Sequence, residues 1–157
     1  MDYYNHVYTI PEVREMMTKK KDIGKREDAD PHGFDFHGAN RDLQIARYKN
    51  NPVIDTRYTN DNEFCALVTI ALNSGHGKTC LSDLKFKPAG AKISFDYPAT
   101  DHGIPSKYIK SEGNVSQFWQ TPGSVACHEE LTFVLVKPKN ENDLPIILTA
   151  YPNGTGA

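Results

Sequence analysis

The segment with the strongest helical pattern in the chain spans residues 60–75. Its apolar side chains recur every three or four residues and fall on one face of a helix: Phe64, Leu67, Val68, Ala71 and Leu72. Asn60 and Glu63 form a capping pair at the start, and Gly75 supplies a C-terminal stop. Because a helix with one apolar face has to bury it against another element, this segment predicts the central core helix.

A second helix is predicted near the N-terminus. Thr9 stands three residues ahead of Glu12, which is the capping-box spacing, and Pro11 falls within the first turn. The helix is expected to run to about residue 19, where the basic run 19–21 suits the negative end of the helix dipole. A shorter helix is predicted over residues 40–49.

Strand patterns follow in the second half of the chain. Residues 92–97 alternate between polar and apolar side chains, 115–120 form a short candidate strand, and 131–136 and 144–151 are apolar and β-branched. Residues 99–114 are expected to form a long polar loop. This order predicts an α+β fold in which N-terminal helices pack on a C-terminal, mainly antiparallel sheet of four to five strands.

Length and composition favour one domain, or one domain with a short arm, in this 157-residue chain. Residues 22–38 are rich in charge, glycine and proline and show no period, which is typical of a loop or hinge. We therefore expect residues 1–55 to be an N-terminal arm or linker with short helices, followed by the main domain over 56–157. No apolar run is long enough to span a membrane, and no signal peptide is visible in the first 30 residues.

Charge and cysteine usage exclude several classes of protein. The 18 Lys and Arg against 20 Asp and Glu give a net charge of −2, which argues against a protein that coats nucleic acid nonspecifically. The chain has an odd number of cysteines, and no two of them form a C-x-x-C pair: Cys65, Cys80 and Cys127. We therefore expect free thiols in a reducing compartment and neither a disulfide framework nor a structural zinc site.

The last two strands predict a hairpin with one apolar and one partly polar face. A turn near residues 140–141 would pair Leu135 with Ile146, Phe133 with Leu148 and Leu131 with Ala150 on the face toward the core helix. The polar groups gather at the open end of the other face: Thr132 opposite Thr149, Glu130 opposite Tyr151, and His128 nearby. Such groups form a candidate acid–base site, although an ordinary solvated sheet face has the same pattern.

The segments Leu-Thr-Phe-Val-Leu-Val (131–136) and Ile-Ile-Leu-Thr-Ala-Tyr-Pro (146–152) resemble the C-terminal strands of small bacterial toxin ribonucleases. The resemblance is to toxin domains of contact-dependent growth inhibition systems, in the RNase-A-like branch of the barnase, EndoU, colicin and RelE-like superfamily. In that branch the last strand carries a Thr-x-Tyr pair, which here would be Thr149 and Tyr151. The resemblance is specific in these two strands and only topological over residues 60–130.

The resemblance implies an enzyme that cleaves RNA, with transfer RNA the expected substrate, without metal or other cofactor. It implies a dedicated immunity protein as partner and a monomer apart from that complex. It also implies either export within a larger toxin that acts in the target-cell cytoplasm, or a cytoplasmic location. The branch uses an early histidine and a basic residue, for which His76 and Lys78 are the leading candidates, with His32, His37 and Arg41 in reserve.

The resulting hypothesis assigns the proton transfers to His76 and His128 and the phosphate contacts to Lys78, Thr149 and Tyr151. Trp119 or Phe118 is a candidate for stacking on an unpaired base, with core packing as the alternative role.

Four other interpretations of the sequence differ in how well the residues support them. The run Gly77-Lys78-Thr79 is not a P-loop, because Leu72 stands where the first glycine is needed and a helix precedes it. His32 and His37 lie near aspartates but match no metal-ligand spacing. The remaining alternatives are a noncatalytic interaction domain that uses the charged arm 19–42, and a DNA- or nucleotide-directed enzyme on a similar fold.

Overall fold

The computed structural model describes residues 1–24, 28–31, 56–113 and 125–153. Its helices are α1 (Ile10–Thr18), α3 (Asp61–Asn73) and α4 (Gly75–Lys85), with short 3-10 helices η2 (Ala99–His102) and η3 (Ser106–Tyr108). Its strands are β1 (Thr56–Tyr58), β2 (Lys92–Tyr97), β3 (Lys110–Gly113), β4 (Val125–Cys127), β5 (Glu130–Val136) and β6 (Ile146–Asn153). The fold class is α+β, as predicted. Among the described residues, no helix is both long and apolar enough to cross a membrane.

The sheet differs from the prediction of four to five strands. The described strands form two antiparallel sheets of three strands each, in the orders β1-β3-β4 and β2-β5-β6. The chain passes from one sheet to the other at His128 and Glu129, between β4 and β5. The region 99–114 is therefore not one long loop, because it contains η2, η3 and β3. The candidate strand at 115–120 and the candidate helix at 40–49 lie outside the described residues.

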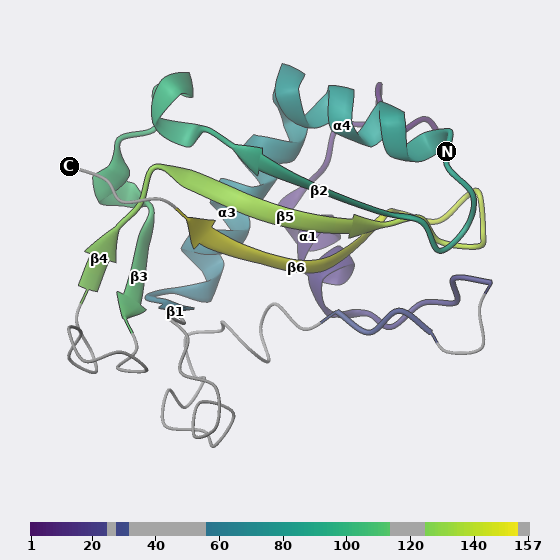
Figure 1. Cartoon of the computed structure of the whole chain (residues 1–157), viewed down its shortest axis with the longest axis horizontal. Coiled ribbons are helices and arrows are strands. Elements are labelled where there is room, and N and C mark those ends of the chain that lie inside the picture. The colour runs from purple at the N-terminus through teal and green to yellow at the C-terminus, as the bar shows by residue number, and fades with distance from the viewer. Residues whose placement is uncertain (25–27, 32–55, 114–124, 154–157) are drawn as a thin grey trace.

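The core lies on one face of the β2-β5-β6 sheet. Figure 1 shows α1 and α3 behind this sheet and α4 along its β2 edge. The predicted cap of α3 is confirmed, since the Asn60 side chain accepts from the Glu63 N–H at 3.0 Å. Four of the five predicted face residues of α3 are buried, and Leu67 packs partly buried against the same cluster.

The N-terminal helix is also part of this core. Thr9 and Glu12 form the predicted capping box. Five apolar side chains of the N-terminal segment are fully or almost fully buried with α3 and the sheet: Tyr3, Tyr8, Val13, Met16 and Met17. The prediction that residues 1–55 form a separate arm therefore does not describe residues 1–18. Farther along, Ile23 and Ala29 cover Val136 and Ile146 on the outer face of the sheet.

The register of the last hairpin differs from the prediction. Next to the turn at residues 140–143, Leu135 pairs with Ile147, a shift of one residue from the expected register. A bulge between Val134 and Leu135 adds a second residue, so that Phe133 pairs with Ala150 and Thr132 with Tyr151. The total shift of two residues leaves the side chains beyond the bulge on their predicted faces, whereas the shift of one residue reverses the faces next to the turn. As a result Ile147, and not Ile146 or Leu148, joins the core cluster.

Helix α4 follows α3 directly, where the sequence predicts only a helix stop at Gly75. Gly75 does not stop α3 but begins α4, and Ser74 caps both helices. The Ser74 hydroxyl donates to Ala71 O at 2.6 Å, and its oxygen accepts from the Gly77 N–H at 3.0 Å. A Cβ on Gly77 would overlap Ala71 O and approach Leu72 Cα to 2.9 Å. Close packing of α4 on α3 thus explains the glycine of the Gly77-Lys78-Thr79 run.

Candidate functional site

The outer face of the β2-β5-β6 sheet carries the polar residues predicted for the last hairpin. Thr132 lies opposite Tyr151, and Thr149 lies opposite Val134. The Thr132 hydroxyl donates to Asp96 Oδ1 at 2.7 Å, across the neighbouring strand pair. Asp96, which the sequence analysis did not select, therefore joins this polar group.

The Thr149 hydroxyl is buried, with 7% of the residue exposed. Within the described part of the chain, its oxygen has no hydrogen-bond partner. A buried hydroxyl without a partner costs about 1–3 kcal/mol, so such groups are unusual in folded proteins.

His76 lies in the first turn of α4, beside the β2 edge of the sheet. Its Nε2 is 3.0 Å from the backbone oxygen of Asp96. A carbonyl oxygen only accepts, so Nε2 carries the proton and Nδ1 of the neutral ring carries the lone pair. The side chain is exposed, and its ring centre is 5.7 Å from that of Phe95. The Ser74 cap sets the position of this first turn and so positions the imidazole.

A second imidazole, that of His102, lies next to His76. The two ring centroids are 6.4 Å apart, and both side chains are exposed. His102 stacks on Tyr97, with centroids 5.0 Å apart and planes within 4°. Tyr97 is 2% exposed, and burial raises the pKa of its phenol, so it is a neutral, fixed platform. We call His76 and His102 the imidazole pair.

Sequence reasoning missed His102 because it lies in the region interpreted as a polar loop. The 3-10 turn of η2 follows β2 directly and ends at Gly103, whose φ of +85° favours glycine. This turn folds the chain back so that His102 returns to the end of β2. A histidine shortly after a predicted strand end was the available signal, but its partner His76 comes from a distant part of the sequence.

The structure does not place the other predicted site residues beside the imidazole pair. Lys78 is two positions after His76 on α4, which places it about 200° around the helix axis. His128 is only 9% exposed, and its backbone N–H donates to Ile109 O at 2.9 Å. Trp119 lies outside the described residues, as do the reserve candidates His32, His37 and Arg41.

Neither metal nor thiol chemistry is favoured at this site. In the described ranges, no three His, Cys, Asp or Glu side chains are placed to hold a metal ion. Cys65, Cys80 and Cys127 are free, and burial raises the pKa of the Cys65 and Cys80 thiols.

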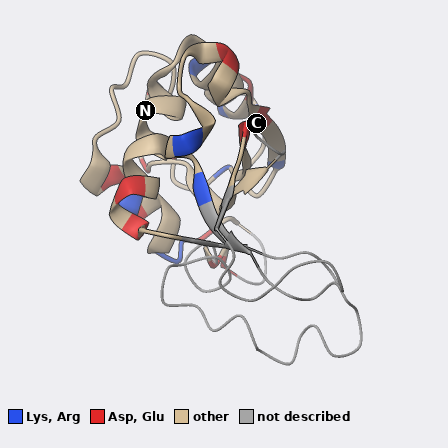
Figure 2. Cartoon of the chain, turned by 90° about the vertical axis from the view of Figure 1, so that its left-hand side faces the viewer, with Lys and Arg blue, Asp and Glu red and all other residues tan. Residues whose placement is uncertain are grey.

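Figure 2 shows basic and acidic residues interspersed over the described elements. An attraction for a polyanion would therefore have to be local.

Comparison of the chain with protein-family models, with curated proteins and with solved structures gives no match.

Proposed function

We propose that this chain is a metal-independent endoribonuclease toxin domain that acts by general acid–base catalysis at the imidazole pair. The observation that carries the proposal is the exposed placement of two histidine rings 6.4 Å apart at one end of the sheet. Histidine suits both proton-transfer roles, because its ordinary pKa is about 6.5. Two imidazoles at this separation are close enough for both to contact one phosphodiester.

The proposed reaction is an internal transesterification. Nδ1 of neutral His76 takes the proton from the ribose 2′-hydroxyl, and the 2′-oxygen attacks phosphorus. The bond from phosphorus to the 5′-oxygen breaks, and protonated His102 gives its proton to that leaving oxygen. The products are a 2′,3′-cyclic phosphate and a free 5′-hydroxyl. We assign the second transfer to His102 rather than His128, because His102 is exposed and His128 is buried.

The strand beside the pair supplies orientation. The Asp96 carbonyl holds Nε2 of His76 and so keeps Nδ1 as the base. Thr149 and Tyr151 are not retained as donors to the phosphorane, because β5 lies between β6 and β2 and their side chains lie on the outer face, whereas the imidazole pair lies against Phe95 and Tyr97 of the core face. Lys78 is not retained either, because it lies on another side of α4.

The biological setting of the proposal comes from the resemblance of the last two strands, including the Thr149–Tyr151 pair, to toxin ribonucleases. On that basis the substrate class is RNA, with transfer RNA tested first, and the partner is a dedicated immunity protein. The domain would act in the cytoplasm of a target cell after export within a larger toxin.

The test is incubation of purified protein with total transfer RNA in EDTA, read on a denaturing gel. Wild-type protein should give discrete fragments that end in 2′,3′-cyclic phosphate and should leave a 2′-deoxy substrate intact. His76→Ala and His102→Ala should each lower the cleavage rate by about 100-fold or more. His6→Ala is the matched control, because His6 pairs with Glu12 away from the imidazole pair.

Each alternative predicts a different pattern of RNA fragments on the gel. Intact RNA with folded wild-type protein would favour a noncatalytic interaction domain. Fragments that persist in His102→Ala but disappear in His128→Ala would return the second proton transfer to His128. Cleavage of deoxy substrates would exclude a mechanism that uses the 2′-hydroxyl.

A further inference from the structure

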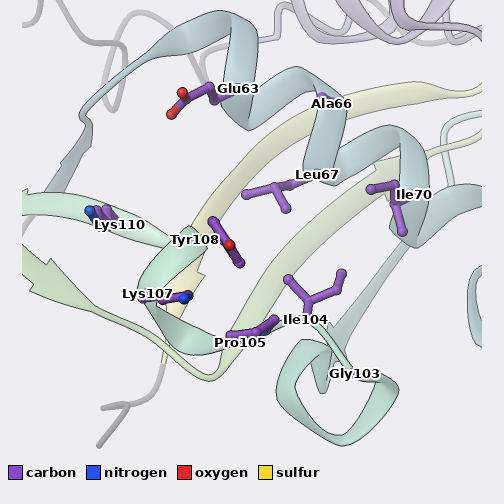
Figure 3. A pocket seen from close by; sticks show the side chains of 10 residues that line it. All are labelled: Glu63, Ala66, Leu67, Ile70, Gly103, Ile104, Pro105, Lys107, Tyr108 and Lys110. Atoms are coloured by element: carbon purple, nitrogen blue, oxygen red, sulfur yellow. The ribbon is translucent and has the colours of Figure 1, made fainter.

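A groove runs along α3, and Gly103, the residue that follows His102, lies at one end of it. It has a volume of about 640 Å³ and lies between α3 and the segment 103–110 (Figure 3). Its lining begins at Gly103, the residue after His102, and includes Leu67, Ile70 and Ile104. Ile70 is 51% exposed, so this apolar surface is open to a ligand. One end of the groove is therefore formed by the residue next to His102 in the chain.

Aromatic and basic side chains from η3 and β3 line the opposite wall. Tyr108 is 58% exposed, and the Lys107 Nζ is 5.1 Å from the centre of its ring. Lys110 follows at the start of β3, and Figure 3 shows it with Glu63 toward the end of the groove away from Gly103. An apolar floor, an exposed aromatic ring and two cations match the parts of a nucleotide: a flat base and an anionic phosphate.

We propose that this groove binds one unpaired base of the RNA strand next to the phosphate that is cleaved. The base stacks on Tyr108 over the apolar floor, and Lys107 and Lys110 contact the following phosphate. This inference rests on the proposed function, because it places the cleaved phosphate at His102. The groove volume lies within the range of about 300–1,000 Å³ that small-molecule sites occupy.

Charge orients the nucleotide in the groove. The phosphate belongs beside the cationic side chains of Lys107 and Lys110. Glu63 is the acidic residue of the lining, and its carboxylate is available to accept from an amino group on the base edge. Stacking itself tolerates any base, so Tyr108 sets affinity for single-stranded RNA rather than for one sequence.

Binding of an uncleavable oligonucleotide tests the groove independently of catalysis. The probe is a fluorescein-labelled 2′-O-methyl RNA tetranucleotide, which lacks the 2′-hydroxyl, and the readout is fluorescence anisotropy at low salt. Tyr108→Ala should weaken binding by about 5- to 150-fold, and Tyr108→Phe should bind like the wild type. Tyr4→Ala is the matched control, since Tyr4 is similarly exposed, at 51%, but lies outside the groove lining.

The outcomes separate this inference from the proposed function. Equal binding by wild type, Tyr4→Ala and Tyr108→Ala, with transfer RNA cleavage intact, would overturn the base site alone. Failure of the wild type to bind the probe while it cleaves RNA would also overturn it and leave the groove to an occupant other than RNA. Binding that depends on Tyr108 without any cleavage would support the base site and refute the nuclease. Neither binding nor cleavage would refute both.

Discussion

The Thr149 hydroxyl is buried on β6 and has no hydrogen-bond partner among the described residues. Valine has nearly the same shape without the polar group, so Thr149→Val should raise the free energy of unfolding by about 1 kcal/mol. The same change should leave the rate of RNA cleavage unchanged, because Thr149 and the imidazole pair lie on opposite faces of the sheet. Urea unfolding followed by circular dichroism, and the cleavage rate at one pH, would test the two expectations.

Thr132→Val provides the matched comparison for Thr149→Val. The Thr132 hydroxyl donates to a carboxylate oxygen of Asp96, so its loss should lower the free energy of unfolding by about 1 kcal/mol. The two threonines are both β-branched and buried on the same sheet face. A destabilised Thr149→Val variant would indicate that its hydroxyl has a partner after all.

The residue scale also shows how much of the site could be predicted. The sequence pointed to Thr149 and Tyr151 on a shared outer face, and a shift of two residues in register preserved that face. It selected His76 as a residue at the end of the core helix. It did not find His102 or Asp96, because their proximity to His76 depends on how α4 and η2 meet the end of β2. Such contacts between distant segments leave no local pattern.

Among the elements, α4 can pack on α3 only with a glycine at position 77, whereas position 75 has room for a side chain. Gly77→Ala should lower the free energy of unfolding by about 2 kcal/mol, because the new Cβ would overlap the backbone of α3. Gly75→Ala should be neutral or stabilising by up to about 1 kcal/mol, since no atom lies within 4 Å of the added Cβ. Urea midpoints of the two variants would decide. Equal effects would mean that the two helices do not pack as described.

The N-terminal cap of α1 makes stability depend on pH. Burial pushes the pKa of Glu12 upward, but hydrogen bonds from the Thr9 N–H and hydroxyl and from His6 outweigh it and hold that pKa below its ordinary value. A lowered pKa in the folded state stabilises above the unfolded pKa of about 4.3, and the contribution is lost as pH falls through the folded pKa.

Glu12→Gln should therefore be less stable than wild type at pH 6, and the difference should shrink below about pH 4. Urea unfolding of both proteins between pH 2.5 and pH 6, at constant ionic strength, measures this. Thr9→Ala should lose about 1 kcal/mol through the same cap. A difference between Glu12→Gln and wild type that stays constant with pH would contradict the role assigned to the carboxylate.

Local signals decided which elements were predictable. The helices α1 and α3 have caps and an apolar period, and β2, β5 and β6 are alternating or β-branched, so each was predicted close to its observed bounds. Helix α4 contains Gly75 and Gly77, which indicate a turn in isolation, and it is stabilised by packing on α3. Strands β3 and β4 are short and carry no strong local pattern. They form because β3 pairs with both β1 and β4.

In the whole molecule, the first residues of the chain contact the loop between β5 and β6 and lie beside the end of α4. The Met1 amino group donates to Glu141 O at 2.7 Å, in the loop between β5 and β6. Beside it, the buried Lys137 ammonium donates to Lys85 O at 2.7 Å and lies 5.5 Å from the Tyr3 ring centre. These contacts connect the first residues of the chain to the end of α4 and to the last hairpin.

Deletion of residues 1–18 should therefore abolish cooperative folding instead of releasing an intact domain. The deleted part contains Tyr3, Tyr8, Val13, Met16 and Met17, all in the main core. Full burial of such a side chain contributes about 1.5–3 kcal/mol, so the loss of five is comparable to a typical net stability of about 5–15 kcal/mol. Met16→Ala, as a milder change, should cost about 2–5 kcal/mol and keep a single transition. Urea titration followed by near-ultraviolet circular dichroism distinguishes these states, and a truncated chain with the wild-type midpoint would restore the separate arm.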